Sequence, residues 1–288
     1  VIRLRSLGDC VLTTPALEVL KRSRPDLRLA VAAEDAFAAV FEGNPHVEAI
    51  LAPQVAAVAG WKPELAINFH GGTRSALLAV RSEARWRAGF AHFRYAMLYN
   101  VRIPRTQEIL GIERIVHTAE HLASAMFFLG APIGEIPPAR LYAPAPEAGR
   151  PYAVLHPVAS AADKTWPAAR FLEVAAELRA SWGLDAVFIG GPGQDLSAFD
   201  EYRTLRGAPL GEIKRLIGGA SAFVGNDSGP AHMAAAFQVP SVVIFGGSDY
   251  RRWRPWKAPS EIVIAEGPIA DVPTAEVIGA LGRLKVAA

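Results

Sequence analysis

The stretch "VGNDSGPAHMAAAF", residues 224–237, decides the fold class of this chain. An apolar run ends at Gly225, polar residues follow, and a Gly-Pro pair opens an alanine-rich segment that predicts a helix, because proline at a first helical position loses no needed N–H. A strand followed by a helix is the repeating unit of α/β folds. Turn chemistry explains the Gly-Pro pair but leaves four polar side chains unexplained: Asn226, Asp227, Ser228 and His232.

The rest of the chain alternates short apolar strands with amphipathic helices, which favours an α/β fold with parallel sheets. Strands are expected at 1–5, 28–33, 47–51, 64–69, 86–90, 152–156, 185–190, 222–225 and 241–246. Helices are expected at 14–23, 35–42, 74–83, 117–129, 167–181, 195–204, 211–217, 229–237 and 273–285. The helix at 14–23 is expected to open at Thr14-Pro15.

The length of 288 residues exceeds what one hydrophobic core usually serves, so two domains are expected. Five prolines without periodicity, in "PPARLYAPAPEAGRP" at 137–151, indicate a linker between them. We therefore expect a first Rossmann-like domain at 1–140, a linker at 141–151 and a second Rossmann-like domain at 152–288 that ends in a helix.

Composition narrows the class of protein. Apolar runs stay far below the length of a membrane-spanning helix, and no signal peptide is expected. The single cysteine, Cys10, excludes an internal disulfide and fits a reducing compartment, so a cytoplasmic location is expected. A net charge of +2 argues against general nucleic-acid binding, whereas local arginine clusters suit an acidic substrate or an anionic membrane surface.

Polar residues follow the strands of the second half at their carboxyl ends, where parallel sheets bind ligands. Ser228 or Gly229 stands at an N-cap position, and free N–H groups of a helix start attract anions. Lys164, with Ser160 in the same loop, could add a positive charge, and Asp195 could hold a ribose hydroxyl. The alternative is that Asp227 and Ser228 only cap their helix.

The first half has a related pattern. Asp9 follows Gly8 directly after the first expected strand, and a carboxylate there could act as a general base or stabilise the start of the next helix. Further along, "NFHGGTRSALLA" places His70 and Arg74 at the same rim of the sheet.

Several short motifs resemble those of other classes of protein. "HTAEH" at 117–121 has a metalloprotease spacing, but no third ligand suggests itself. "GNDSG" lacks the G-x-S-x-G spacing, "GGPG" lacks a third dinucleotide-binding glycine, and no P-loop occurs. No Asp-x-Asp occurs, which argues against a metal-bridged sugar nucleotide.

Three motifs together resemble glycosyltransferase family 9, the ADP-heptose:lipopolysaccharide heptosyltransferases. They are "RLRSLGDCVLTTPAL" at 3–17, "HPVASAADKTWPAARF" at 156–171 and "VGNDSGPAHMAAAFQVPSVVIFGGSD" at 224–249. The resemblance implies a GT-B fold, in which two Rossmann-like domains with parallel sheets face a central cleft. The domain at 1–140 would bind the acceptor, and the domain at 152–288 would bind the nucleotide sugar. It also implies an inverting transfer without a cofactor or obligatory metal.

The resemblance also implies roles for individual residues. Asp9 would be the general base, and Lys164 would stabilise the leaving diphosphate. The donor would be held by Ser160, Lys164, Asp195, Asp227, Ser228, Gly229 and His232. The acceptor would be bound by Gly8, Thr13 and Arg74.

The expected function is transfer of heptose from ADP-heptose to a lipopolysaccharide-core or related anionic glycolipid, by a cytoplasmic enzyme that contacts the inner face of the inner membrane. Two alternatives remain open. One is a related enzyme, such as an epimerase, that uses another sugar nucleotide. The other is a non-catalytic protein that binds a sugar nucleotide or a glycan.

Overall fold

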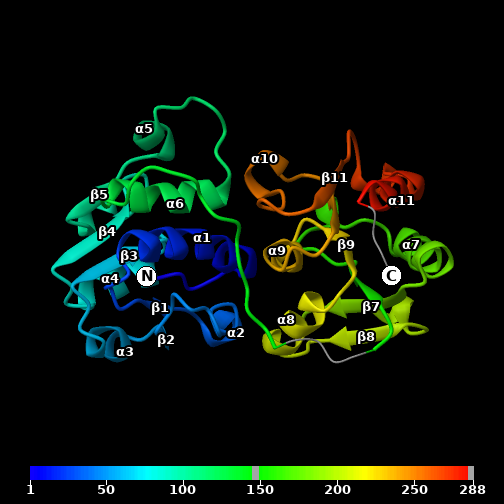
Figure 1. Cartoon of the computed structure of the whole chain (residues 1–288), viewed down its shortest axis with the longest axis horizontal. Coiled ribbons are helices and arrows are strands. Elements are labelled where there is room, and N and C mark those ends of the chain that lie inside the picture. The colour runs from blue at the N-terminus through cyan, green and yellow to red at the C-terminus, as the bar shows by residue number, and fades with distance from the viewer. Residues whose placement is uncertain (145–148, 285–288) are drawn as a thin grey trace. The chain divides into compact units, whose positions relative to one another are not determined.

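A computed structural model describes residues 1–144 and 149–284 and divides into two compact units, Val1–Tyr142 and Ala143–Ala288 (Figure 1). The linker expected at 141–151 includes residues 145–148, which lie outside the described residues, as does the end of the helix expected at 273–285.

Unit 1 is built on parallel strands. Strand β1 (Ala30–Ala32) pairs with β2 (Ala49–Leu51), and β3 (Leu65–Asn68), β4 (Trp86–Phe90) and β5 (Val101–Ile103) pair in that order. Ile2 bridges Ala32 on one side and Asn68 on the other, so the first residues join the two groups of strands. The strand expected at 1–5 is therefore reduced to a short bridging segment.

The helices of unit 1 are α1 (Leu7–Ser23), α2 (Asp35–Ala38), α3 (Val55–Gly60), α4 (Thr73–Arg81), α5 (Thr106–Leu110) and α6 (Thr118–Phe128), with a short 3₁₀ turn η1 (Ala96–Leu98). Helices α1 and α6 pack side by side (Figure 1). Strand β5, α3, α5 and η1 were not predicted, because these short segments carry no clear helix or strand periodicity.

Helix α1 corrects one prediction, because Pro15 lies inside the helix instead of opening it. Proline has no N–H for the carbonyl of Val11, four residues earlier. The Thr14 hydroxyl donates a hydrogen bond to that carbonyl at 2.8 Å instead. The helix therefore continues through the proline, and its start at Leu7 puts Asp9 in the first turn.

Unit 2 contains one sheet of six parallel strands in the order β11-β10-β9-β6-β7-β8. Their bounds are β6 (Tyr152–His156), β7 (Asp185–Gly190), β8 (Arg203–Arg206), β9 (Ala222–Asn226), β10 (Ser241–Phe245) and β11 (Ser260–Ile264). The helices are α7 (Ala168–Trp182), α8 (Leu210–Gly218), α9 (Gly229–Ala236), α10 (Tyr250–Trp253) and α11 (Thr274–Arg283). Short 3₁₀ turns are η2 (Ala162–Lys164), η3 (Ser197–Phe199) and η4 (Ile269–Asp271).

The helix expected at 195–204 is wrong. Leu196 and Phe199, three residues apart, are buried by the single turn η3, and the chain then forms the edge strand β8. The charged ends of β8 hide its strand character, because "RTLR" lacks the apolar run that marks a buried strand.

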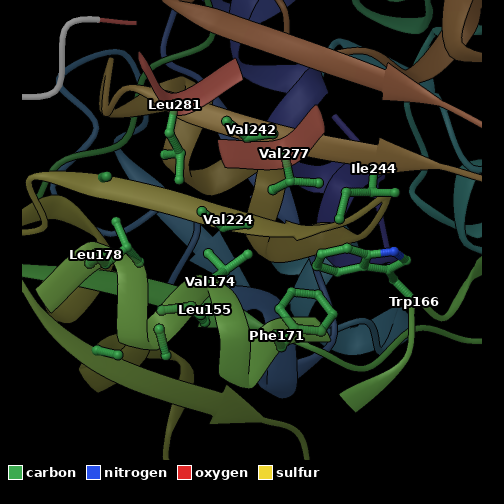
Figure 2. Packing of buried hydrophobic residues seen from close by; sticks show 14 of the residues in the cluster. Leu155, Trp166, Phe171, Val174, Leu178, Val224, Val242, Ile244, Val277 and Leu281 are labelled. Atoms are coloured by element: carbon green, nitrogen blue, oxygen red, sulfur yellow. The ribbon is translucent and has the colours of Figure 1, made fainter. Parts of the chain in front are cut away.

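The core of unit 2 fills one face of its sheet. Alternate strand residues such as Leu155, Val224 and Ile244 point toward α7 and α11, as the two-residue period of a strand requires. Figure 2 shows Trp166 beside Phe171 in this core, and their rings meet edge-on with centroids 5.0 Å apart. Helices α8 and α9 lie on the opposite side of the same sheet (Figure 1).

Candidate active site

The candidate donor site of unit 2 lies where the strand order reverses. From β6 the chain runs outward to β7 and β8, and it then returns to β9, which pairs with β6 on its other side. The loops after β6 and β9 therefore leave the sheet in opposite directions. In α/β sheets this switch point is where ligands bind.

Asn226, the last residue of β9, holds the loop that follows β6. Its side-chain oxygen accepts a hydrogen bond from the Trp166 N–H at 3.1 Å, and its amide nitrogen donates to the Pro157 carbonyl at 3.0 Å. Asn226 is fully buried, so both bonds are shielded from water. One side chain thus fixes both ends of the 157–166 loop, and this explains why an asparagine stands at position 226.

The loop after β10 touches the same segment from the next strand. A Cβ atom at Gly246 would lie 2.1 Å from the Asp163 carbonyl oxygen, and one at Gly247 would lie 2.4 Å from a carboxylate oxygen of Asp163. At Gly246 only glycine permits the two loops to come this close, because the neighbouring oxygen belongs to the backbone. The loops after β6, β9 and β10 therefore converge, as the sequence predicted for the carboxyl edge of this sheet.

Ser228 precedes α9 but does not cap it. Within α9, whose residues the structure describes in full, no backbone N–H bonds to the Ser228 hydroxyl. Its oxygen lies 2.9 Å from Nδ1 of His156, the last residue of β6. The alternative that Ser228 serves only as a helix cap is therefore wrong.

The first turn of α9 offers few backbone donors. Pro230 has no N–H, and the Ala231 N–H bonds to the Ser228 carbonyl at 3.2 Å. The Gly229 N–H remains as the donor that this helix end can present to an anion, at the positive end of the helix dipole.

Lys164 and Asp227 provide the charges beside this helix end. Lys164 ends the turn η2 and is half-buried. Burial raises the pKa of the Asp227 carboxyl, while the neighbouring Ser248 and the Lys164 ammonium act in the opposite direction. Lys164 is therefore close enough to influence Asp227, and the predicted donor residues on these two loops come together.

The remaining predicted donor residues differ in accessibility. Ser160 is exposed in the loop that carries Lys164. His232 is buried in α9, and its ring centroid lies 6.3 Å from that of Trp253 in α10. Asp195 is exposed after β7 and accepts a hydrogen bond from the Ser197 N–H at 2.8 Å, so its contact with a ribose stays a prediction.

In unit 1, Asp9 lies in the first turn of α1 with a side chain that is 26% exposed. The Arg3 guanidinium is buried and forms an ion pair with this carboxylate at 3.5 Å. The Ser6 hydroxyl donates a hydrogen bond to the other carboxylate oxygen at 3.0 Å. Asp9 is thus oriented by two neighbours and still reachable from solvent, as a general base must be.

His70 lies near this carboxylate. Its Nδ1 is 3.2 Å from the Arg5 carbonyl oxygen. Burial, followed by the charge of Arg3, lowers the pKa of His70, whereas Asp9 raises it slightly. The imidazole is therefore mainly neutral near pH 7 and adds little charge to the surroundings of Asp9.

The residues predicted to bind the acceptor are only partly available. Thr13 has no exposed surface; it accepts a hydrogen bond from Arg3 Nε at 3.2 Å and donates one to the Asp9 carbonyl at 2.8 Å. The acceptor contact of Thr13 stays a prediction, and in this structure its hydroxyl orients Arg3. Gly8 is buried, and Arg74 is exposed but paired with Glu34 at 3.3 Å.

The "HTAEH" histidines make contacts within the protein. His117 precedes α6 and accepts a hydrogen bond from the Ala119 N–H, and His121 Nδ1 lies 2.7 Å from the Thr106 hydroxyl. Among residues 1–144 and 149–284, no group of three or more potential metal ligands occurs. The metalloprotease alternative has no structural support in this motif.

His156 and Arg3, the partners of Ser228 and Asp9, were not predicted from the sequence. A histidine that ends a buried strand, and an arginine inside a first strand, were the available signals. Neither residue type indicates which residue it contacts, because the partner can be distant in sequence: Ser228 lies 72 residues from His156.

This doubly wound unit and the second α/β unit have the architecture of the GT-B glycosyltransferases. The glycosyltransferase family 9 (heptosyltransferase) model matches residues 60–275, and the chain belongs to this family.

Known relatives agree with this assignment. The chain is 25% identical to lipopolysaccharide heptosyltransferase 3 of Escherichia coli, over 94% of this chain and 89% of that protein. It is similar in fold to a family 9 glycosyltransferase of Veillonella parvula, with a TM-score of 0.85, 20% identity and coverage of 98% and 95%. It is also similar to an E. coli heptosyltransferase determined with ADP, with a TM-score of 0.80, 18% identity and coverage of 98% of both chains.

Proposed function

We propose that this enzyme transfers heptose from ADP-heptose to a lipopolysaccharide-core or related glycolipid acceptor. The observation that carries the proposal is the open start of α9 at the switch point, with Lys164 beside it. This arrangement suits a diphosphate. The relative named lipopolysaccharide heptosyltransferase 3 and a similar structure determined with ADP-2-deoxy-2-fluoro heptose support the choice of donor and acceptor class.

The proposed reaction is a single displacement that inverts the anomeric centre. Asp9 accepts the proton of the acceptor hydroxyl while the hydroxyl oxygen forms a bond to the anomeric carbon. The bond between that carbon and the diphosphate oxygen breaks, and its electron pair leaves on ADP. Lys164 and the Gly229 N–H stabilise the negative charge that develops there. No metal or cofactor is required in this scheme.

We further propose that unit 1 contacts an anionic membrane surface. Met97 and Leu98, in η1, are 67% and 38% exposed and lie in sequence between Arg94 and Arg102. In the described part of unit 1, neither arginine forms an ion pair with a carboxylate. Apolar side chains flanked by cations favour anionic lipid surfaces. No helix within the described ranges is long and apolar enough to cross a membrane.

Calorimetric titration of ADP, UDP and GDP, first without metal and then with magnesium, tests the donor assignment. We expect metal-independent binding of ADP in preference to the others, followed by turnover of ADP-heptose with a glycolipid acceptor. Preference for UDP or GDP would overturn the heptose assignment. Product formed without acceptor would favour an epimerase, and nucleotide binding without turnover would favour a binding protein.

A further inference from the structure

A buried histidine, His156, pairs with the half-buried Ser228 that precedes α9. Strands β6 and β9 are neighbours with His156 opposite Gly225, so the end of β6 reaches the residues that follow β9. His156 is 6% exposed, and its Nδ1 lies 2.9 Å from the Ser228 oxygen. The pair therefore forms from the register of the sheet.

We propose that His156 is a positioning residue for the donor diphosphate, which directs the Ser228 hydroxyl toward a phosphate oxygen. This inference rests on the proposed function. It assigns a role to a residue that does not itself contact the donor. The need for such a residue follows from the first turn of α9. Pro230 has no backbone N–H, and the N–H of Ala231 is already bonded to the Ser228 carbonyl, so neither can bind a phosphate oxygen. The Ser228 hydroxyl then supplies a hydrogen-bond donor that the backbone of Pro230 and Ala231 does not.

The protonation state of His156 decides which way the Ser228 proton points. Burial lowers the pKa of His156 to about 4, so the ring is neutral at physiological pH and carries one N–H. When Nδ1 carries the hydrogen, it donates to the Ser228 oxygen and leaves the serine O–H for phosphate. When Nε2 carries it, the serine donates to Nδ1 and presents only lone pairs to the anion. Binding of the sugar nucleotide therefore favours the tautomer in which Nδ1 carries the hydrogen.

His156 is separable from the residue that holds the loop. Asn226 holds the ends of the 157–166 loop through Pro157 and Trp166, and Trp166 Nε1 also donates a hydrogen bond to the Val272 carbonyl. His156 makes its polar contact with Ser228. Substitution of His156 can therefore be expected to change phosphate binding without releasing the loop.

The test is a double-mutant cycle on the full chain, read out as the Kd for ADP by calorimetry. Leucine and asparagine have nearly the same shape, and asparagine keeps a polar atom close to the position of Nδ1. We expect His156→Leu to weaken ADP binding roughly tenfold, the effect of one hydrogen bond to a charged group, and His156→Asn to stay within about threefold of wild type. Thermal melting confirms that each variant is folded.

The Ser228→Ala variant and the double variant measure the interaction between His156 and Ser228. We expect Ser228→Ala to weaken ADP binding as much as His156→Leu, and the double variant H156L/S228A to be no weaker than either single variant. Additive losses, or equal losses in His156→Asn and His156→Leu, would overturn the positioning role. Wild-type protein that binds no nucleoside diphosphate would instead overturn the proposed function itself.

A spectroscopic measurement reads the tautomer directly. The ¹⁵N shifts of the His156 ring, assigned by comparison with His156→Asn, should report the Nδ1–H form in the complex with ADP. An Nε2–H ring in that complex would contradict the proposed hydrogen-bond direction, whatever the affinities.

Discussion

Arg3 and Asp9 form an ion pair at 3.5 Å in which the guanidinium is buried and the carboxylate is partly exposed. A carboxylate held in this way is oriented before the acceptor arrives. We expect Asp9→Asn to lower kcat by about two to four orders of magnitude, the usual contribution of a general base, while the Kd for ADP stays unchanged. Steady-state turnover and calorimetry measure the two effects separately.

Asp35 provides the matched control, because it is also an aspartate in the first turn of a helix, α2. Asp35→Asn should leave turnover near that of wild type. Comparable turnover in Asp9→Asn and wild type would show that Asp9 is not the base.

Lys164→Gln removes the positive charge beside the start of α9. We expect the Kd for ADP to rise about tenfold to a hundredfold, as for loss of one charged hydrogen bond, and the transfer rate to fall with it. Lys257 is an exposed lysine of the same unit that lies over the Trp256 ring, and Lys257→Gln is the control. Equal affinities for ADP in the two variants would remove Lys164 from the diphosphate site.

Gly246→Ala tests the contact between the loops after β6 and β10. The new methyl group would overlap the Asp163 carbonyl oxygen, which belongs to the backbone and cannot rotate away. We expect a loss of about 1–3 kcal/mol in unfolding free energy and weaker ADP binding. Gly211 in α8 has open space around its Cα, so Gly211→Ala should be neutral or stabilising. A Gly246→Ala variant as stable as wild type would mean that the loops do not touch in solution.

The buried His156 makes stability depend on pH. Its pKa of about 4 in the folded state lies below 6.5, its ordinary value, so the unfolded chain binds the proton more readily. The stabilisation is complete above pH 6.5 and is lost as the pH falls toward 4, by about 3 kcal/mol in total. Urea unfolding at pH 7 and pH 5 should therefore show a larger loss of stability for wild type than for His156→Asn. Parallel losses would contradict a buried neutral ring.

Vesicle sedimentation tests the proposed membrane surface. We expect binding to vesicles that contain phosphatidylglycerol, weaker binding at high salt, and none to pure phosphatidylcholine. Met97→Asp should reduce binding several-fold, whereas Ile133→Asp, at a position that is 68% exposed, should not. Equal effects of the two substitutions would argue against a surface centred on η1.

Local sequence patterns were sufficient for the parts of the fold with strong periodicity. The apolar runs of β6, β7, β9 and β10 each end in a polar or glycine-rich loop, and the loops after β6, β9 and β10 converge as predicted. Pro15 misled the prediction of α1, because the compensating Thr14 hydroxyl is visible only in the folded helix. Strand β11 was missed because the polar Ser260 and Glu261 at its start leave an apolar run of only three residues.

The site could be predicted only as a set of residue types. Lys164, Asp227 and Ser228 stand out as polar residues after buried strands. Their partners could not be inferred, because a hydrogen bond between His156 and Ser228 depends on the register of β6 with β9. Thr13 shows the reverse case, since its place in a site motif suggested a ligand contact, whereas the structure shows its buried hydroxyl bonded to Arg3 and to the Asp9 carbonyl.

Asn226 has a consequence for how this site can diversify. Its two hydrogen bonds hold the loop at Pro157 and at Trp166, so the residues between those points are anchored at both ends independently of their own identity. Residues of this segment that make no contact with other loops, such as the exposed Ser160, can therefore change while the strands on either side keep their register. Asp163, which packs against Gly246, and Lys164 are the positions in it that such changes have to preserve.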